Sequence, residues 1–335
     1  MNKRVDMAGL ARLAGVSKST VSRALADSPL VSKATKQVII DLAAESGYAV
    51  NTTARNFRLG RTGIVAVVLT LEPNSPQTTN DPFFMTMIAE IAEQLRDKGY
   101  NTLLSHERLT TSQSFLQSQT CQGSDGVIFI GQGRHHDTLN ELASAGLPMA
   151  VWGAELSGRV YPLVGSDNEL GGYLACRHLL SRGCNRIGFM GDLDYPEPQL
   201  RYSGYVRALK EAGYAGSGQA VEASVSFDPT SARRAMRDYL ANNKHIDGLL
   251  CCSDVIAISA ISLLQELGRR VPEDVSVVGY DNLSLAEITH PALTSIDQDV
   301  PWGARQLCDS LFSQVNELEC SDRLASARLV IRASA

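Results

Sequence analysis

The sequence predicts an α/β protein in which a small helical unit precedes two lobes built on doubly wound parallel sheets. Three observations support this prediction. Two short amphipathic runs meet at a glycine within residues 6–25. From residue 63 onward, apolar strand patterns alternate with helical ones, which is typical of parallel α/β layering. Residues 1–61 hold ten Lys or Arg and four acids, whereas residues 62–335 hold 21 and 32, so the two segments carry +6 and −11.

The first helix and the turn after it have the pattern of a helix-turn-helix. Asp6 is placed to cap a helix. Gly15 then supplies a tight turn, and Ser17 is placed to cap a second helix. Between the cap and the turn, apolar residues repeat at helical spacing and predict a buried stripe: Leu10, Ala11, Leu13 and Ala14.

The second helix carries the candidate DNA-reading surface. Val21 and Leu25 face back toward the first helix. The remaining side chains are polar or basic, which suits base edges and phosphates in a major groove: Lys18, Ser19, Thr20, Ser22 and Arg23. The alternative is an ordinary helical hairpin whose outward face is merely solvated. The positive charge confined to residues 1–61 favours nucleic-acid binding over that alternative.

A third helix is expected from Ser32 to Gly47, with Val38, Ile39 and Leu42 closing a three-helix core. A short helix should follow within residues 51–62. An exposed phenylalanine between two arginines there fits an apolar wedge that enters the minor groove, and the alternative is a linker that packs on the next domain. The DNA-contacting residues expected in this segment are Asn51, Ala54, Arg55, Phe57 and Arg58.

In the remainder of the chain, strands are expected at 63–69, 101–105, 126–131, 149–152, 186–191, 248–252 and 276–279. Helices are expected at 83–99, 170–183, 201–213 and 255–268. Because the strands are continuously apolar rather than alternating, both faces of each sheet should be covered by helices.

Polar and aromatic side chains follow these strands, where the carboxyl ends of a parallel sheet open into a crevice. Carboxylates, amides and guanidinium groups pair with sugar hydroxyls, and aromatic faces stack on the C–H surface of the ring. Asp81 and the loop 192–201 also lie after strands. For any single acid, helix capping is the simpler explanation, and Asp254 and Asp281 both precede helical or turn segments. The expected effector-binding residues are Phe83, Phe84, Gln132, Trp152, Asp167, Arg201, Ser253, Asp254, Asp281 and Gln298.

Several classes of protein are disfavoured by what the sequence lacks. It has no signal-peptide pattern and no apolar run long enough to span a bilayer. Its seven cysteines are scattered without a C-x-x-C pair, which indicates a reducing cytoplasm. It lacks G-x-x-x-x-G-K-[ST], H-E-x-x-H and G-x-S-x-G. His135 and His136 read as a solvated pair rather than a metal site. We therefore expect a cytoplasmic protein that is not an enzyme and has no cofactor, metal or membrane partner.

Four segments together resemble the LacI/GalR family of transcriptional regulators over essentially the full chain. They are residues 6–63, VGSDNELGGYLACRHLLSRGCNRIGFMGD, the R-x-x-G at Arg201–Gly204, and VPEDVSVVGYDNLSLAEITHPALTSIDQD. The resemblance implies a headpiece over 1–50, a hinge helix over 51–62 and a core over 63–335 similar to a type I periplasmic binding protein. Lobe 1 is expected at about 63–163 and 294–322, and lobe 2 at about 164–293 and 323–335.

The resemblance also assigns roles to particular residues. It places Lys18, Ser19 and Arg23 at base-reading positions and Phe57 at the intercalating position of the hinge. It places the effector pocket at Asp167, Arg201, Ser253, Asp281 and Gln298, with Phe83, Phe84 and Trp152 lining the cleft. The family commonly has Leu at the wedge and Pro before the hinge Asn, whereas this chain has Phe57 and Val50. Ser253 stands where some relatives carry Asn.

These expectations describe a homodimeric repressor of carbohydrate-utilisation genes. It would bind a pseudo-palindromic operator and be released when a sugar, such as a glucoside or disaccharide, binds between the lobes. The alternatives are a secreted or cytoplasmic sugar-binding protein without a DNA-binding role, and a regulator that uses its ligand as a corepressor. Trp152 and the acid-rich rim favour an inducer. The C-terminal segment RLASARLVIRASA has no heptad helix, so a tail-mediated tetramer is not expected.

Overall fold

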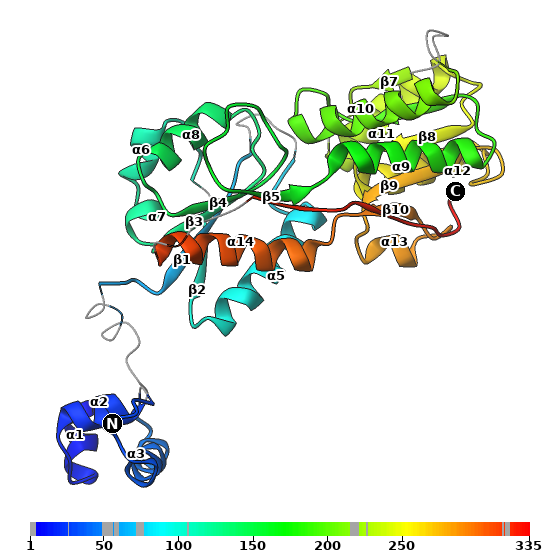
Figure 1. Cartoon of the computed structure of the whole chain (residues 1–335). Helices are drawn as coiled ribbons and strands as arrows, with labels where there is room; N and C mark the ends of the chain where they lie inside the picture. Colours follow the sequence, from blue (N-terminus) through cyan, green and yellow to red (C-terminus); the bar gives the residue numbers. More distant parts are fainter. Residues whose placement is uncertain are drawn as a thin grey trace. The chain divides into compact units, whose positions relative to one another are not determined.

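A computed structural model describes residues 5–25, 27–48, 56, 60–71, 77–105, 107–214, 221–225, 227–316, 318 and 322–335. Contacts divide the chain into two units, Met1–Thr62 and Gly63–Ala335 (Figure 1). In the part of the chain that is described, no helix combines the length and the apolar character needed to cross a bilayer.

Between residues 5 and 48, the described part of the N-terminal unit holds three short helices whose starts are fixed by side-chain caps, as the sequence predicts. They are α1 (Met7–Leu13), α2 (Lys18–Leu25) and α3 (Lys33–Glu45). The Asp6 carboxylate accepts the N–H of Gly9 at 2.7 Å, and the Ser17 hydroxyl accepts the N–H of Thr20 at 3.1 Å. The Ser32 hydroxyl caps α3 in the same way. Each cap satisfies a backbone donor that the helix itself leaves unpaired.

The core of this unit is narrower than the apolar pattern indicates. Leu10, Val21 and Ile39 are fully buried, but the predicted core residues Leu13 and Val38 are 57% and 52% exposed. Three short helices bury only one stripe each. A residue that lies about 100° around the helix from that stripe faces solvent whatever its polarity. The placement of Leu13 and Val38 in the core was therefore wrong.

The second unit contains two six-stranded sheets (Figure 1). The first has the order β11-β5-β4-β3-β1-β2 and is parallel throughout. Its strands are β1 (Ile64–Leu69), β2 (Asn101–Ser105), β3 (Gly126–Ile130), β4 (Met149–Trp152), β5 (Leu163–Ser166) and β11 (Arg323–Ala325). The second has the order β12-β10-β9-β8-β6-β7, and only β12 runs antiparallel to its neighbour. Its strands are β6 (Ile187–Met190), β7 (Val221–Ala223), β8 (Gly248–Cys251), β9 (Ser276–Asp281), β10 (Thr294–Asp297) and β12 (Arg328–Val330).

Helices cover both faces of the first sheet, as its continuous strand hydrophobicity predicts. Val65 and Val67 of β1 pack with α5 and α14, whereas Ala66 and Val68 pack with residues of α6 and α8. The helices of this lobe are α5 (Pro82–Asp97), α6 (Ser112–Leu116), α7 (Gln119–Gln122), α8 (His136–Ser144) and α14 (Val300–Val315). Those of the second lobe are α9 (Asn168–Ser181), α10 (Pro196–Glu211), α11 (Pro229–Asn242), α12 (Asp254–Glu266) and α13 (Leu285–Ile288).

The chain passes between the lobes after β5, after β10 and between β11 and β12. Each crossing lies a few residues later than the expected boundaries at 163, 294 and 322. Strand β5 still pairs with β4 of the first lobe, β10 with β9 of the second, and β11 with β5 of the first. These strands are only three or four residues long, so pairing with distant strands decides which sheet each one joins.

Two glycines allow helices α9 and α10 to cross in backbone contact. A Cβ on Gly172 would overlap the carbonyl oxygen of Arg201, and one on Gly204 would overlap that of Glu169. Glycine is needed here because the approaching atoms are backbone and cannot move aside. The glycine of the R-x-x-G motif therefore fixes the position of α10 and of the Arg201 side chain that it carries.

We expect Gly204→Ala to lower the free energy of unfolding by about 3 kcal/mol, because the added methyl group forces the two backbones apart. The measurement is urea unfolding of the full chain. Ser203→Ala is the matched control, since Ser203 is exposed on the same helix. Equal midpoints for the two variants would contradict the close crossing.

Candidate functional site

Helix α2 presents its predicted DNA-reading side chains to solvent. Lys18, Ser19 and Arg23 are exposed, and Thr20 and Ser22 are half-buried. The opposite face is anchored by buried residues. The Ser17 hydroxyl lies 2.7 Å from that of Ser19 and 2.8 Å from that of Thr20, so the cap also orients these two side chains. The other expected DNA contacts lie outside the described residues: Asn51, Ala54, Arg55, Phe57 and Arg58.

A pocket opens in the second unit where the carboxyl ends of its strands meet. It is lined from the first lobe by residues at or just after the ends of β1, β3 and β4. From the second lobe it is lined by residues of α10 and by residues at or just after the ends of β8 and β9. Its empty volume is about 730 Å³, open mouth included, which suits a small-molecule ligand. Seven of the ten expected effector residues line it: Phe83, Phe84, Trp152, Arg201, Ser253, Asp281 and Gln298.

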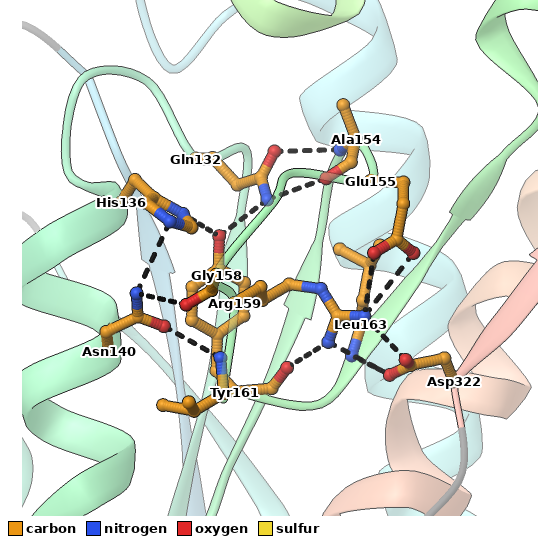
Figure 2. Close-up of polar contacts among 11 residues, drawn as sticks. Gln132, His136, Asn140, Ala154, Glu155, Gly158, Arg159, Tyr161, Leu163 and Asp322 are labelled. Carbon is orange, nitrogen blue, oxygen red and sulfur yellow. Dashed lines mark hydrogen bonds and ion pairs between the residues drawn. The ribbon is translucent and has the colours of Figure 1, made fainter.

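Gln132 is not among the residues that line the pocket and instead bonds to the segment after β4 (Figure 2). It is fully buried, and its amide exchanges two hydrogen bonds of 2.8 Å with the backbone of Ala154. Its Nε2 also donates to the hydroxyl of Tyr161 at 2.7 Å, which lies 3.0 Å from Nδ1 of His136. Burial therefore ties Gln132 to protein groups, and the structure does not support its assignment to the effector. His135 and His136 are half-buried, so the pair is partly exposed to solvent.

The same region is tied to the segment before β11 through Arg159 (Figure 2). The Arg159 guanidinium bonds Glu155 at 3.1 Å and Asp322 at 2.5 Å. The side chain of Arg159 is 8% exposed, so this pair is shielded from solvent on one side. The loop after β4 is thus held to the start of β11, which belongs to the same sheet.

Two of the expected acids also have structural partners instead of facing the pocket. Asp167 is exposed and caps α9 by accepting the N–H of Leu170 at 2.9 Å. Asp254 is buried, and its carboxylate accepts the N–H of Leu283 at 2.7 Å and the Ser295 hydroxyl at 2.5 Å. Burial raises the pKa of Asp254 to about 7. Their assignment to the effector pocket is not supported by the structure, and capping or bracing explains both positions.

The polar floor of the pocket is built around Arg201. Its guanidinium lies flat on the ring of Tyr280, 3.7 Å from the ring centroid. Its Nε donates to Asn168 Oδ1 at 2.8 Å, and its Nη1 donates to the carbonyl of Cys252 at 2.5 Å. These contacts hold a buried cation in one orientation. They leave Nη2 without a hydrogen-bond acceptor among the described residues.

Asp281 and Gln298 form the adjoining part of the floor. Gln298 accepts the Ser166 hydroxyl at 2.7 Å and donates to Asp281 Oδ1 at 2.7 Å. Burial raises the pKa of Asp281 well above its ordinary value, and the charge of Arg201 opposes this rise. Asp281 has a φ of +112°, a conformation that side chains rarely adopt outside turns and functional sites.

Aromatic side chains enter the pocket from both lobes. The rings of Phe83 and Trp152 lie 6.2 Å apart on the first lobe. Tyr195 and Phe227 meet edge to face, 6.4 Å apart, on the second. Both pairs line the pocket, so a bound ring can be covered by apolar surface contributed by each lobe.

Sequence reasoning named the loop 192–201 without singling out Tyr195 or Glu197 within it, and it did not name Phe227. Glu197 had a usable signal, because it lies four residues before Arg201 and therefore on the same face of a helix. Phe227 had none, since it follows the three-residue strand β7, which shows no detectable strand pattern.

Comparison with known proteins identifies the family. Residues 176–335 match the model of a periplasmic binding protein-like domain, and residues 6–51 match that of bacterial regulatory proteins of the lacI family. The HTH-type transcriptional repressor PurR of Mannheimia succiniciproducens is 30% identical over 298 residues, covering 86% of this chain and 85% of that protein. This chain belongs to the LacI family. PurR of Pasteurella multocida is 28% identical and covers 92% of this chain and 91% of its own length.

Solved structures agree with this assignment. A complex of the transcriptional regulator CelR with cellobiose is 29% identical with a TM-score of 0.71, covering 98% of this chain and 99% of that one. A LacI-family regulator from Enterococcus faecium with bound ribose is 27% identical with a TM-score of 0.70, covering 81% and 98%. The lac repressor dimer bound to operator and the anti-inducer ONPF, at 21% identity, shares the fold with a TM-score of 0.81 over 99% of both chains. The predicted fold class is confirmed, and this LacI-family protein is a DNA-binding transcriptional repressor with a ligand-binding core.

Proposed function

We propose that this repressor controls carbohydrate-utilisation genes and leaves its operator when a sugar binds in the pocket between the core lobes. The observation that carries the proposal is the composition of that pocket. Charged and amide groups form its floor, and aromatic rings face them from both lobes. A sugar ring has the matching surfaces, with hydroxyl groups at its edge and C–H groups on its faces.

The free hydrogen-bonding capacity of the floor supports a polyhydroxyl ligand. Arg201 keeps Nη2 to donate, and Asp281 keeps one carboxylate oxygen to accept. The Ser253 hydroxyl accepts the N–H of Ile256 at 3.2 Å, so its proton remains to donate. Each sugar hydroxyl both donates and accepts, and neighbouring hydroxyl groups can bridge such a mixed set.

The DNA-binding side of the proposal rests on charge and symmetry. The +6 charge of residues 1–61 supplies phosphate contacts that weaken with salt. A homodimer with a two-fold axis would place two copies of α2 on the half-sites of a pseudo-palindrome. To change a mostly bound population into a mostly free one, the sugar must favour the released state by about 5.5 kcal/mol, which two sites can supply together.

Two related structures add support. The CelR structure is a cellobiose complex, and the Enterococcus faecium regulator has bound ribose. Both proteins are more than 25% identical to this chain, and both bind sugars. The curated relatives are named as transcriptional repressors, which agrees with a negative regulator.

The test combines a stability screen with DNA binding. We expect one or more mono- or disaccharides, with cellobiose and ribose in the panel, to stabilise the full chain by about 2.7 kcal/mol at 100 times the dissociation constant. The same sugar should weaken binding to a DNA fragment selected by the protein from a random library. Tighter DNA binding would make the sugar a corepressor, and a panel without any stabilising sugar would refute the carbohydrate assignment.

A further inference from the structure

The pocket holds more acidic than basic side chains. Among the described residues, its lining includes Asp81, Glu197 and Asp281 but only one cation, Arg201. Burial raises the pKa of each of the three carboxyl groups, because the surroundings solvate their charge poorly. These surroundings disfavour any further negative charge, and each carboxylate that is ionised would also repel an anionic effector.

The three acids differ in how many hydrogen bonds their carboxylates already accept from protein groups. The carboxylate of Asp81 accepts the N–H of Phe83 and the amide of Gln77, both at 2.9 Å. Asp281 accepts from Gln298. Glu197, in the first turn of α10, has no hydrogen bond or ion pair with the side chain of another described residue, although it lines the pocket. Among the described residues its carboxylate bonds only its own backbone N–H, so it can still accept from a ligand.

The one cation cannot act as an anion receptor. Tight phosphate or carboxylate recognition uses two parallel N–H donors of a guanidinium, or several cations together. In Arg201, Nε is bonded to Asn168 and Nη1 to the carbonyl of Cys252, and the flat face is covered by Tyr280. Only Nη2 remains, which suits a single hydroxyl group.

Building on the proposed sugar response, we propose that Glu197 is a specificity-determining residue that restricts the effector to uncharged sugars. Its free carboxylate accepts hydroxyl groups of the sugar. Together with Asp81 and Asp281, it repels sugar phosphates and sugar acids, whose charge would lie beside like charges in a poorly solvated pocket. The position of Glu197 one helical turn before Arg201 places acceptor and donor side by side on α10.

The test compares neutral and anionic members of matched pairs by calorimetric titration of the full chain. The pairs are glucose with glucose 6-phosphate, trehalose with trehalose 6-phosphate, and cellobiose with cellobionate. We expect binding in at least one pair, with the neutral member favoured by about 100-fold, as a like-charge contact requires.

Substitution then identifies the selecting residue. Glu197→Gln keeps the side-chain shape but removes the charge, and we expect it to reduce the preference for the neutral member by about tenfold or more. Glu273→Gln, an exposed surface change of equal charge, should leave the preference unchanged. A substitution that acted only through folding or net charge would not selectively change the ratio of the neutral to the anionic affinity.

Three outcomes would overturn the inference. An anionic member that binds the unmodified protein as tightly as its neutral partner would refute the charge selection. A preference that Glu197→Gln leaves intact would refute the role of this residue while the sugar response stands. If no sugar in these pairs or in the wider panel binds, the proposed function fails, and the role of Glu197 fails with it.

Discussion

Replacing Arg23 by alanine is expected to abolish sequence-specific operator binding while sugar binding persists. Arg23 is exposed on α2, and its neighbours Val21 and Ala24 are buried on the opposite side of the helix. An arginine that contacts a base edge contributes about 1–3 kcal/mol of discrimination. A dimer loses two such contacts, so the expected loss is about 2–6 kcal/mol, and specific binding should approach non-specific binding.

The measurement is fluorescence anisotropy with a selected DNA fragment and with a scrambled one, over a range of salt concentrations. If Arg23 reads a base, the difference between the two fragments disappears but the salt dependence changes little. Arg12→Ala removes an equal charge from the exposed surface of α1 and should retain discrimination. Loss of both DNA and sugar binding in the Arg23 variant would show a structural role instead.

Replacing Asp281 by asparagine is expected to give a repressor that stays on its operator in the presence of sugar. One oxygen of Asp281 is held by Gln298, and the other faces the pocket with no protein partner among the described residues. The amide of asparagine keeps the shape but presents a donor where the sugar hydroxyl needs an acceptor. A buried sugar hydroxyl left without its acceptor costs about 1–3 kcal/mol, so we expect a 10- to 100-fold weaker sugar affinity.

The response is measured as the sugar concentration that releases half of the bound DNA. Asp238→Asn, on the exposed surface of α11 in the same lobe, should respond like the unmodified protein. Arg201→Ala should also lose the response, but it removes the bonds to Asn168 and Cys252 and should destabilise the lobe as well. An Asp281 variant that releases DNA at the normal sugar concentration would show that the pocket is misassigned.

Asp254 and Asp281 look alike in the sequence, but only one of them faces the pocket. Both acids follow or end a strand of the same sheet, and both were expected to contact the effector or cap a helix. In the structure, Asp254 braces the turn after β9 through Leu283 and Ser295, whereas Asp281 lines the pocket. Whether such a carboxylate is used up by protein hydrogen bonds or faces the pocket depends on segments that lie far away in the sequence. No local sequence pattern therefore distinguishes Asp254 from Asp281.

Local and compositional features were determined by the sequence itself. The caps at Asp6, Ser17 and Ser32 act within three residues, and the charge difference between the two ends is a property of composition. The buried strands β1, β3 and β4 are likewise recognisable from continuous apolar runs. A few neighbouring residues are enough to predict these features, because capping and strand burial depend on groups that are adjacent in the sequence.

Tertiary structure alone decided which side chains face the pocket and to which lobe the short strands belong. Glu197 reaches the pocket because the crossing at Gly172 and Gly204 sets how α10 is turned. Gln132 is withdrawn from it by the amide pairing with Ala154. These outcomes follow from packing between segments that are remote in sequence, where steric fit and the satisfaction of buried polar groups decide among side chains that look equivalent in the sequence.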